Sequence, residues 1–271
     1  MKILVTGYNG FLGRNLIKSL NRKKYNVFFV GRKKIDSENF YKCDFKNLVT
    51  LGKILNKIKP DIIINLVAFV NFSKKTPLML KINALVPRFF STYCKKNKKY
   101  LIQSSGTLVH GESEFYSIKT KLNPKNYYGV SKLKADKFII KSKCDSCIIR
   151  FPGIYGKDGP EHLGINKFIN YKLLNKKITF NGNVHSKRNY IYVDDAVKIL
   201  IKCIRDRLKG IFYVGGEIKT FNQMILLLNK YLPNKDNIII IDNKEIIKNQ
   251  IVRRTKSFLY TSFVSSIKKI L

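Results

Sequence analysis

The stretch that decides the fold is Thr6-Gly7-Tyr8-Asn9-Gly10-Phe11-Leu12-Gly13. It follows the apolar run Lys2–Thr6, which is typical of a buried strand, and it opens Phe11–Leu20, where apolar residues recur at helical spacing. Glycines at positions 7, 10 and 13 permit a tight turn, a close approach of the backbone to phosphate groups and close packing of helix on strand. A strand, a glycine turn and a helix in this order predict a dinucleotide-binding fold whose helix N-terminus faces negative charge.

Up to Gly156 the chain continues to alternate apolar runs with segments of helical spacing. Further strands are predicted at Tyr25–Val30, Phe40–Cys43, Ile62–Leu66, Tyr100–Gln103 and Cys147–Phe151. Further helices are predicted at Leu48–Ile58, from Thr76 to about Lys95, and at Tyr127–Lys141. This order predicts an α/β fold with a doubly wound, mostly parallel sheet of the Rossmann type.

Beyond Gly156 the pattern changes. A loop rich in Gly and Pro leads to a predicted helix at Asn166–Leu174, and a strand at Asn189–Val193 precedes a helix from Asp194. We therefore expect a small C-terminal lobe that is interleaved with the first domain. The predicted division is a cofactor-binding domain over residues 1–155, to which residues 186–208 return, and a substrate-binding lobe formed by residues 156–185 and 209–271.

The net charge is extreme, because 53 basic residues face 17 acidic ones and the sum is +36. Nucleic acid is the first partner that such a charge suggests. The basic residues are mostly Lys and are scattered, however, and no zinc-finger spacing, helix-turn-helix pattern or RNP-like aromatic motif is visible. We therefore expect no specific nucleic-acid partner, whereas a basic surface would attract a phosphorylated cofactor and an anionic substrate.

Five scattered cysteines, an odd number, indicate free thiols. Cys144 and Cys147 form a lone CxxC without two further ligands at suitable spacing, and the three histidines lie far apart, so we expect no metal site. No apolar run approaches the roughly 18 residues of a membrane span. The N-terminus lacks the apolar region and cleavage site of a signal peptide, so we expect a cytoplasmic protein without membrane association.

The end of the second predicted strand bears on the choice of cofactor. Folds that bind NAD usually place an acidic residue there for the ribose hydroxyls. Here the residue is Gly31, followed by Arg32, Lys33 and Lys34. No carboxylate is present to repel a 2′-phosphate, and the Arg32 guanidinium can bond it bidentately. The pattern therefore favours NADP over NAD.

Two segments carry groups suited to acid–base chemistry. Tyr128 and Lys132 are four residues apart at the start of a predicted helix and share one face. An ammonium close to the phenol would lower the pKa of Tyr128, so that it exchanges a proton nearer neutral pH. The segment Ser104–Gly111 follows the carboxyl end of a predicted strand, where functional groups gather in open parallel sheets, and its hydroxyls could bond a substrate oxygen.

Together these motifs resemble the extended short-chain dehydrogenase/reductases, also called the NAD-dependent epimerase/dehydratase family. The resemblance covers nearly the whole chain, because further motifs follow in the order that the family has. These are Asp44-Phe45, Asn65–Ala68, Arg150–Gly156, Arg188–Asp195 and Arg254–Leu259.

The resemblance implies roles for individual residues. It implies catalytic roles for Tyr128 and Lys132, with Thr107 or Ser105 supplying a hydroxyl. It implies that NADP is held by Gly7, Asn9, Gly10, Phe11, Leu12, Gly13, Arg32, Lys33, Asp44, Phe45, Leu66, Ala68, Tyr128, Lys132 and Pro152. It implies that a nucleotide-sugar substrate is bound by His110, Asn166, Arg188 and Arg254.

The chain departs from the family pattern beside the predicted catalytic pair. Gly106 stands at the usual catalytic Ser/Thr position, which is why Thr107 or Ser105 must supply the hydroxyl. Members that are dehydratases carry an Asp-Glu pair where this chain has Thr107-Leu108, so dehydration is not expected. Members that epimerise carbons next to a ketone place a Cys where Leu108 stands.

Because these departures argue against dehydration and against epimerisation next to a ketone, the expected reaction is reduction of a 4-keto nucleotide sugar with NADPH. Tyr128 would give a proton while Lys132 holds the nicotinamide ribose. A nucleotide-sugar 4-epimerase with tightly held NAD(P) remains an alternative, as does a non-catalytic NADP-binding regulatory protein, which the glycine at position 106 motivates. Dimers are common in the resembled family, so a homodimer is also left open.

Overall fold

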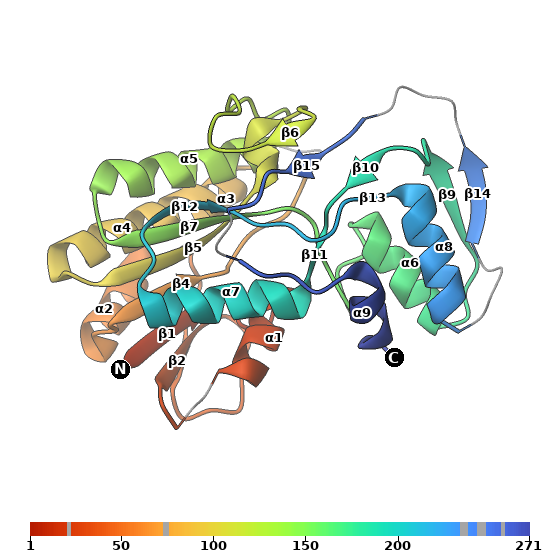
Figure 1. Ribbon diagram of the computed structural model, residues 1–271. Coiled ribbons are helices and arrows are strands. Elements are labelled where there is room, and N and C mark those ends of the chain that lie inside the picture. The colour runs from red at the N-terminus through yellow and green to blue at the C-terminus, as the bar shows by residue number, and fades with distance from the viewer. Residues whose placement is uncertain (21–22, 73–75, 234–237, 243–247, 256–257) are drawn as a thin grey trace. The chain divides into compact units, whose positions relative to one another are not determined.

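The structure is a computed structural model that describes the chain except for residues 21–22, 73–75, 234–237, 243–247 and 256–257. The backbone divides into two compact units, whose elements are labelled in Figure 1. Unit 1 consists of Met1–Gly111, Lys121–Arg150 and Val197–Phe212. Unit 2 consists of Glu112–Thr120, Phe151–Ala196 and Tyr213–Leu271.

Unit 1 is built on a seven-stranded sheet. Its strands are, in spatial order, β12 (Gly210–Tyr213), β7 (Ser146–Phe151), β5 (Tyr100–Gly106), β4 (Ile62–Asn65), β1 (Lys2–Thr6), β2 (Asn26–Gly31) and β3 (Phe40–Lys42). The pairs β1–β2, β1–β4, β2–β3 and β4–β5 are parallel. The order reverses between β1 and β4, and in such sheets ligands bind beyond the carboxyl ends of the strands at this switch point. The predicted Rossmann-type α/β fold is thereby confirmed.

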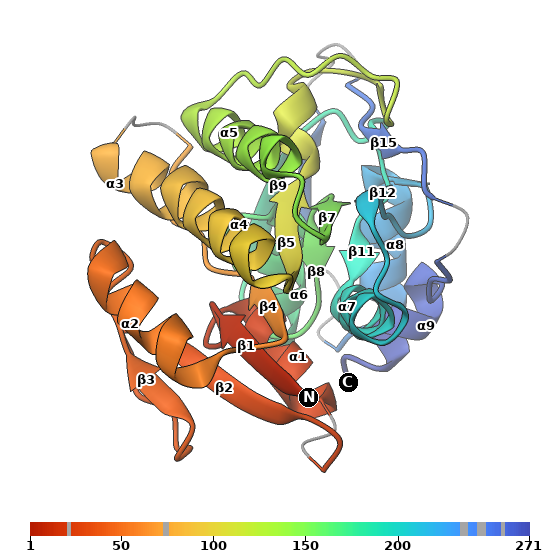
Figure 2. The same ribbon diagram turned by 90° about the vertical axis from the view of Figure 1, so that its left-hand side faces the viewer.

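Helices cover both faces of this sheet, as Figure 2 shows. One face is covered by α2 (Leu48–Ile58), α4 (Val86–Asn97) and α5 (Tyr127–Ser142), whose apolar sides form one buried cluster with alternate strand residues. The other face is covered by α1 (Phe11–Ser19) and by the unit 1 part of α7 (Val193–Asp206). Because both faces are covered, the central strands are apolar along nearly their whole length, which explains why they appear as continuous runs in the sequence.

The helix predicted from Thr76 to about Lys95 is interrupted. The Thr76 side chain accepts a hydrogen bond from the Met79 N–H (3.1 Å) and caps α3 (Pro77–Leu80), after which a π-helical turn spans Lys81–Leu85 before α4. Pro87 lies in the first turn of α4 and has no N–H to donate to the preceding turn, so the helix widens there. The wide turn carries the buried Asn83.

The described residues of unit 2 form paired short strands and helices, and they include the first residues of α7. The pairs are β8 (Ile154–Tyr155) with β11 (Ile191–Tyr192), β9 (Ile178–Gly182) with β14 (Ile238–Asp242), β10 (Lys187–Arg188) with β13 (Lys219–Thr220), and β6 (Phe115–Tyr116) with β15 (Ile251–Val252). The helices are α6 (Gly164–Leu173), α8 (Phe221–Tyr231) and α9 (Phe263–Lys268). Phe180 joins this core by its ring contacts with Phe168 and Phe221, at centroid distances of 5.9 and 5.2 Å.

The unit boundaries differ from those drawn on the sequence. Residues 112–120, which the sequence analysis kept in the first domain, belong to unit 2 because β6 pairs with β15. The segment that returns to unit 1 is 197–212 instead of 186–208, since β10 pairs with β13 and β11 pairs with β8, all within unit 2. A short surface segment carries too little periodicity to show its pairing partner, and both differences concern such segments.

Among the described residues, no helix is long and apolar enough to cross a membrane, and no group of His, Cys, Asp or Glu could hold a metal ion.

Candidate active site

The glycine turn between β1 and α1 has the tight geometry that its sequence predicts. Gly7 has φ of +67°, and a Cβ there would lie 2.5 Å from the Leu66 carbonyl carbon. The Gly10 N–H donates to the Gly7 carbonyl (3.0 Å), and a Cβ on Gly13 would lie 2.2 Å from the same oxygen. Helix α1 begins at Phe11 without a side-chain cap and without an acidic residue in its first turn. Its first N–H groups therefore point to a place where a phosphate would be favoured.

A cavity of about 560 Å³ opens beside this turn. Eight of the fifteen residues predicted to hold the cofactor line it: Gly7, Asn9, Gly10, Arg32, Lys33, Phe45, Leu66 and Ala68. Tyr8, Gly31 and Val67 complete the lining. The carboxyl ends of β1, β2 and β4 thus contribute to one hollow, as the switch point predicts.

The other predicted cofactor residues lie elsewhere. Leu12 and Gly13 are buried in the packing of α1 and Phe11 is partly buried, and none of the three lines the cavity. Asp44 is exposed, and its carboxylate accepts a hydrogen bond from the Lys46 N–H (2.9 Å), so it closes the turn before α2. Pro152 belongs to unit 2. Spacing alone could not separate residues that shape the turn from residues that line the cavity.

A buried chain of hydrogen bonds joins the glycine turn to the predicted catalytic helix. Thr6 Oγ1 donates to Asn65 Oδ1 (2.7 Å), and Asn65 Nδ2 donates to Gln103 Oε1 (2.8 Å). Gln103 Nε2 donates to the Ser104 carbonyl (2.8 Å), which also accepts from Lys132 Nζ (2.5 Å). The sequence signal for these hydrogen bonds was a polar residue at the end of each of three apolar strands, Thr6, Asn65 and Gln103, and the sequence analysis missed it. The hydrogen bonds fix the Lys132 ammonium at the carboxyl end of β5.

Tyr128 and Lys132 both lie in the first two turns of α5, where Asn126 caps the helix by accepting from the Gly129 N–H (2.8 Å). The expectation of a lowered phenol pKa is not met, because burial raises the pKa of Tyr128 to about 12. The Lys132 ammonium is turned to the Ser104 carbonyl, so burial outweighs its effect on the phenol. Tyr128, whose ring meets Phe72 edge-on at 5.5 Å, therefore keeps its proton at neutral pH.

The two candidate hydroxyls have different surroundings. Ser105 is 4% exposed, and its Oγ lies near Asp136, with no hydrogen-bond partner for either Ser105 Oγ or Asp136 Oδ1 among the described residues. Thr107 instead opens the 3-10 turn Thr107–His110, against which α5 packs. Gly129 permits this close packing, since a Cβ there would lie 2.6 Å from the Leu108 carbonyl oxygen. The turn that begins at Thr107 thus packs against the N-terminal part of α5 at Gly129, whereas Ser105 lies near Asp136 further along the same helix.

Two further residues hold α5 in place. Asp136 lies one turn beyond Lys132, and its carboxylate forms a buried ion pair with Arg150 (3.0 Å). Asn83 bonds the backbone N–H and carbonyl of Phe69 (2.7 and 2.8 Å) and also donates to Ser131 Oγ (3.0 Å), so it ties the loop after β4 to α5. The i, i+4 spacing of Lys132 and Asp136 was a usable sequence signal, whereas Asn83 is placed by the π-helical turn, which the sequence does not announce.

The buried ammonium of Lys132 predicts a pH-dependent stability. Burial lowers the pKa of Lys132 from 10.5 to about 8, although the Asp136 carboxylate opposes this shift. Between these two pKa values the unfolded chain holds the proton and the folded protein does not, so the free energy of unfolding rises with pH by up to about 1.4 kcal/mol per unit. We predict that the free energy of unfolding of Lys132→Met, measured with urea between about pH 8 and pH 10.5, lacks this rise with pH. Lys134→Met, at an exposed position of the same helix, should keep it, and equal slopes for wild type and Lys132→Met would contradict the prediction.

The four predicted substrate residues divide into two kinds. His110 is buried, and its Nδ1 lies 3.0 Å from the Lys121 carbonyl oxygen. Asn166 is also buried, and its amide bonds Gly156 N–H, the Ile154 carbonyl and the Pro160 carbonyl, so it braces a loop of unit 2. As placed, both side chains serve the structure of their own unit.

The two arginines have more accessible guanidinium groups. Arg188 donates to the Lys187 carbonyl (2.8 Å) and stands over the Phe221 ring at 5.1 Å. Arg254 is exposed and stands over the Tyr260 ring at 3.9 Å. Both belong to unit 2, and Lys256 and Ser257 of the motif that contains Arg254 lie outside the described residues.

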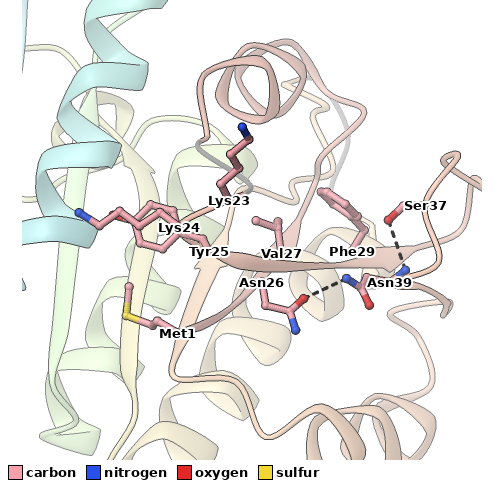
Figure 3. Close-up of a pocket in the computed structure, with 9 residues that line it drawn as sticks. All are labelled: Met1, Lys23, Lys24, Tyr25, Asn26, Val27, Phe29, Ser37 and Asn39. Carbon is pink, nitrogen blue, oxygen red and sulfur yellow. Dashed lines mark hydrogen bonds between the residues drawn. The ribbon is translucent and has the colours of Figure 1, made fainter.

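A second cavity, of about 440 Å³, lies in unit 1 at the opposite ends of the strands (Figure 3). Met1 and Asn26, which line it, precede or begin parallel strands, whereas Gly7 and Gly31 follow or close the carboxyl ends of the same strands. Asn39 Nδ2 donates to Asn26 Oδ1 (3.0 Å) and its N–H donates to Ser37 Oγ (3.3 Å), so its polar groups serve the local loop. The chemistry-bearing residues are gathered at the other end of the sheet.

Comparisons with known proteins agree with this arrangement. Residues 3–215 match the NAD dependent epimerase/dehydratase family. Over 259 residues the chain is 30% identical to a dTDP-D-glucose 4,6-dehydratase of Dictyostelium discoideum, with 82% of this chain and 59% of the relative covered. The chain thus spans less than two thirds of that relative's length.

Solved structures show the same fold. A dTDP-4-dehydrorhamnose reductase from Bacillus anthracis in complex with NADP has a TM-score of 0.82 at 21% identity, with 99% of this chain and 98% of that chain covered. A UDP-glucuronic acid 4-epimerase from Bacillus cereus in complex with NAD has a TM-score of 0.81 at 22% identity, with 99% and 96% covered. The matched family model spans most of the sequence and confirms the predicted family: the chain belongs to the NAD-dependent epimerase/dehydratase family.

Proposed function

We propose that the protein is an NADPH-dependent reductase of a 4-keto nucleotide sugar. The observation that carries this proposal is the position of Tyr128 at the start of α5, which packs against a turn, Thr107–His110, that contains no carboxylate. A phenol that keeps its proton suits a group that must donate one to a developing alkoxide. The dehydratase relative from Dictyostelium shares the fold, but Thr107 and Leu108 offer no acid–base pair for removing water.

The residues of unit 1 fit a nicotinamide dinucleotide. Gly7 and Gly10 line the cavity, so the turn presents backbone without side chains to whatever occupies it. The uncapped N-terminus of α1 would face the pyrophosphate, and the cavity between Phe45 and Leu66 would take the adenosine. Lys132 would hold the nicotinamide ribose through its ammonium.

Such a cofactor would supply a hydride to the carbonyl carbon. Tyr128 donates its phenolic proton to the oxygen of the same carbonyl, and Thr107 donates a hydrogen bond to that oxygen. The hydrogen-bond chain from Thr6 to the Ser104 carbonyl keeps Lys132 from turning away from the site. Arg188 and Arg254 of unit 2 would bind the diphosphate of the sugar nucleotide, because guanidinium groups match phosphate oxygens bidentately.

We further propose that NADP is preferred over NAD. Gly31 carries no acid, and the exposed Arg32 and Lys33 line the cavity. We predict that wild type binds NADP more tightly and that Arg32→Asp reverses the order, each by roughly tenfold, in fluorescence titrations of the reduced cofactors. Lys34→Asp makes the same charge change at a residue that does not line the cavity, and it should keep the wild-type order. A wild-type preference for NAD would contradict this prediction.

A nucleotide-sugar 4-epimerase is the second candidate, because the fold likeness extends to a UDP-glucuronic acid 4-epimerase. An epimerase would return its hydride to the same carbon and would turn over without added NADPH.

We also propose a cytoplasmic location, since the five cysteines are all free thiols, which fits a reducing compartment.

NADPH consumption tests the proposal. The purified protein is supplied with NADPH and, in turn, with 4-keto sugars attached to different nucleoside diphosphates, and the loss of NADPH absorbance is followed. We expect consumption that depends on one of these sugars. Conversion of a nucleotide sugar to its 4-epimer without any consumption of NADPH would favour the epimerase. Binding of NADP without turnover of any of these sugars would favour a regulatory protein.

A further inference from the structure

Tyr8 follows Gly7 in the glycine turn. It lines the cavity beside this turn and is 2% exposed. Its ring covers Gly31 at the carboxyl end of β2. A Cβ built on Gly31 would lie 2.8 Å from Tyr8 Cε1 and 3.0 Å from its hydroxyl oxygen. The distance to Cε1 is shorter than two carbon atoms allow and the distance to the hydroxyl oxygen is tight, so a side chain at position 31 fits only if the Tyr8 ring moves.

The ring has little freedom to move. Its edge contacts place its centroid 5.7 Å from that of Phe29 and 6.2 Å from that of Phe40. The Tyr8 hydroxyl donates a hydrogen bond to the Lys33 carbonyl. Packing on two sides and a hydrogen bond at the tip hold the ring in one position.

Position 31 is where an acidic residue would meet the ribose hydroxyls of NAD. Tyr8 therefore has two effects at this point of the cavity. Its ring removes the space for a carboxylate at position 31, and its hydroxyl fixes the backbone of the segment that presents Arg32 and Lys33.

We propose that Tyr8 is a specificity-determining residue: it favours a 2′-phosphorylated dinucleotide by fixing the segment Gly31–Lys33, which presents Arg32 and Lys33, and its ring leaves no room at position 31 for the acidic side chain that would favour NAD. This inference rests on the proposed dinucleotide-dependent function. It differs from the role of Arg32, because Tyr8 makes no charged contact itself and acts through its neighbours in the cavity wall.

The test compares dissociation constants for NADP and NAD in wild type, Tyr8→Ala, Gly31→Asp and the double variant Tyr8→Ala/Gly31→Asp. We expect Gly31→Asp alone to lose affinity for both dinucleotides by roughly tenfold or more, since the ring and the new side chain compete for one space. The double variant should regain affinity for NAD and prefer it over NADP by roughly tenfold, because the carboxylate then reaches the ribose and repels the 2′-phosphate. If Gly31→Asp does not fold with Tyr8 in place, the double variant still carries the test.

Tyr8→Phe separates the two effects, because it keeps the ring and removes the bond to the Lys33 carbonyl. It should weaken the preference for NADP, and Gly31→Asp in this background should still lose both dinucleotides. The inference is overturned if Gly31→Asp prefers NAD as strongly with Tyr8 present as without it, or if the double variant still prefers NADP. A wild type that binds neither dinucleotide would overturn the proposed function and, with it, this inference.

Discussion

Tyr128→Phe is expected to reduce turnover by roughly 10²-fold or more while the fold and dinucleotide binding survive. The substitution removes one oxygen and keeps the ring, so the edge contact with Phe72 is retained. The substitution removes no described hydrogen bond that supports α5, since the helix is capped by Asn126. The measurement is kcat on a confirmed substrate together with the dissociation constant for NADP.

Tyr127→Phe is the matched control for this variant. Tyr127 is the neighbouring residue of the same helix and is 46% exposed, so it is outside the proposed proton path. We expect its turnover to equal that of wild type. Near-normal turnover in Tyr128→Phe would rule out the phenol as proton donor, whereas an equal loss in both variants would point to damage of the helix N-terminus.

Gly7→Ala is the second change with a large expected effect. Its φ of +67° is unfavourable for any residue with a side chain, and the new Cβ would lie 2.5 Å from the Leu66 carbonyl carbon. Strain of this kind costs about 1–3 kcal/mol, and relief of the overlap would move the loop that lines the cavity. We therefore expect a lower free energy of unfolding in urea and a loss of affinity for NADP of roughly tenfold or more.

Gly164→Ala provides the control, because a Cβ at Gly164 has no atom within 4 Å and the residue begins a helix with an ordinary backbone conformation. This variant should keep NADP affinity and unfold at an equal free energy, or at one higher by about 0.4–1 kcal/mol, since alanine restricts the unfolded chain. Gly7→Ala with wild-type stability and wild-type NADP affinity would contradict the role of the turn.

Much of the fold could be predicted because its signals are local. The glycine turn reports its own geometry, and the apolar runs of β1, β2 and β4 report strands that are covered on both faces. The π-helical turn at Lys81–Leu85 was not predicted, because a proline within a helical pattern indicates an irregularity but not its form. The pairing of β6 with β15 joins segments more than 130 residues apart, and two-residue strands leave no periodicity to read.

The site was predictable as a set of motifs but not as a set of contacts. The positions of Tyr128 and Lys132 on one helix followed from their spacing. Their electrostatics did not, because the direction of the phenol pKa depends on burial and on the Ser104 carbonyl that engages the ammonium. Likewise, the sequence showed a glycine at position 31, and only the structure shows that the Tyr8 ring requires it.

The most direct test of the proposed reduction is an isotope-transfer measurement. The protein is incubated with a 4-keto nucleotide sugar and NADPH that carries deuterium at the transferable position of the nicotinamide, and the sugar product is analysed by NMR. The proposed function predicts one deuterium at the former carbonyl carbon and one NADP formed for each sugar reduced, with product formed roughly 10²-fold or more slowly in Tyr128→Phe. A sugar product that carries no deuterium, formed without any net consumption of NADPH, would contradict it.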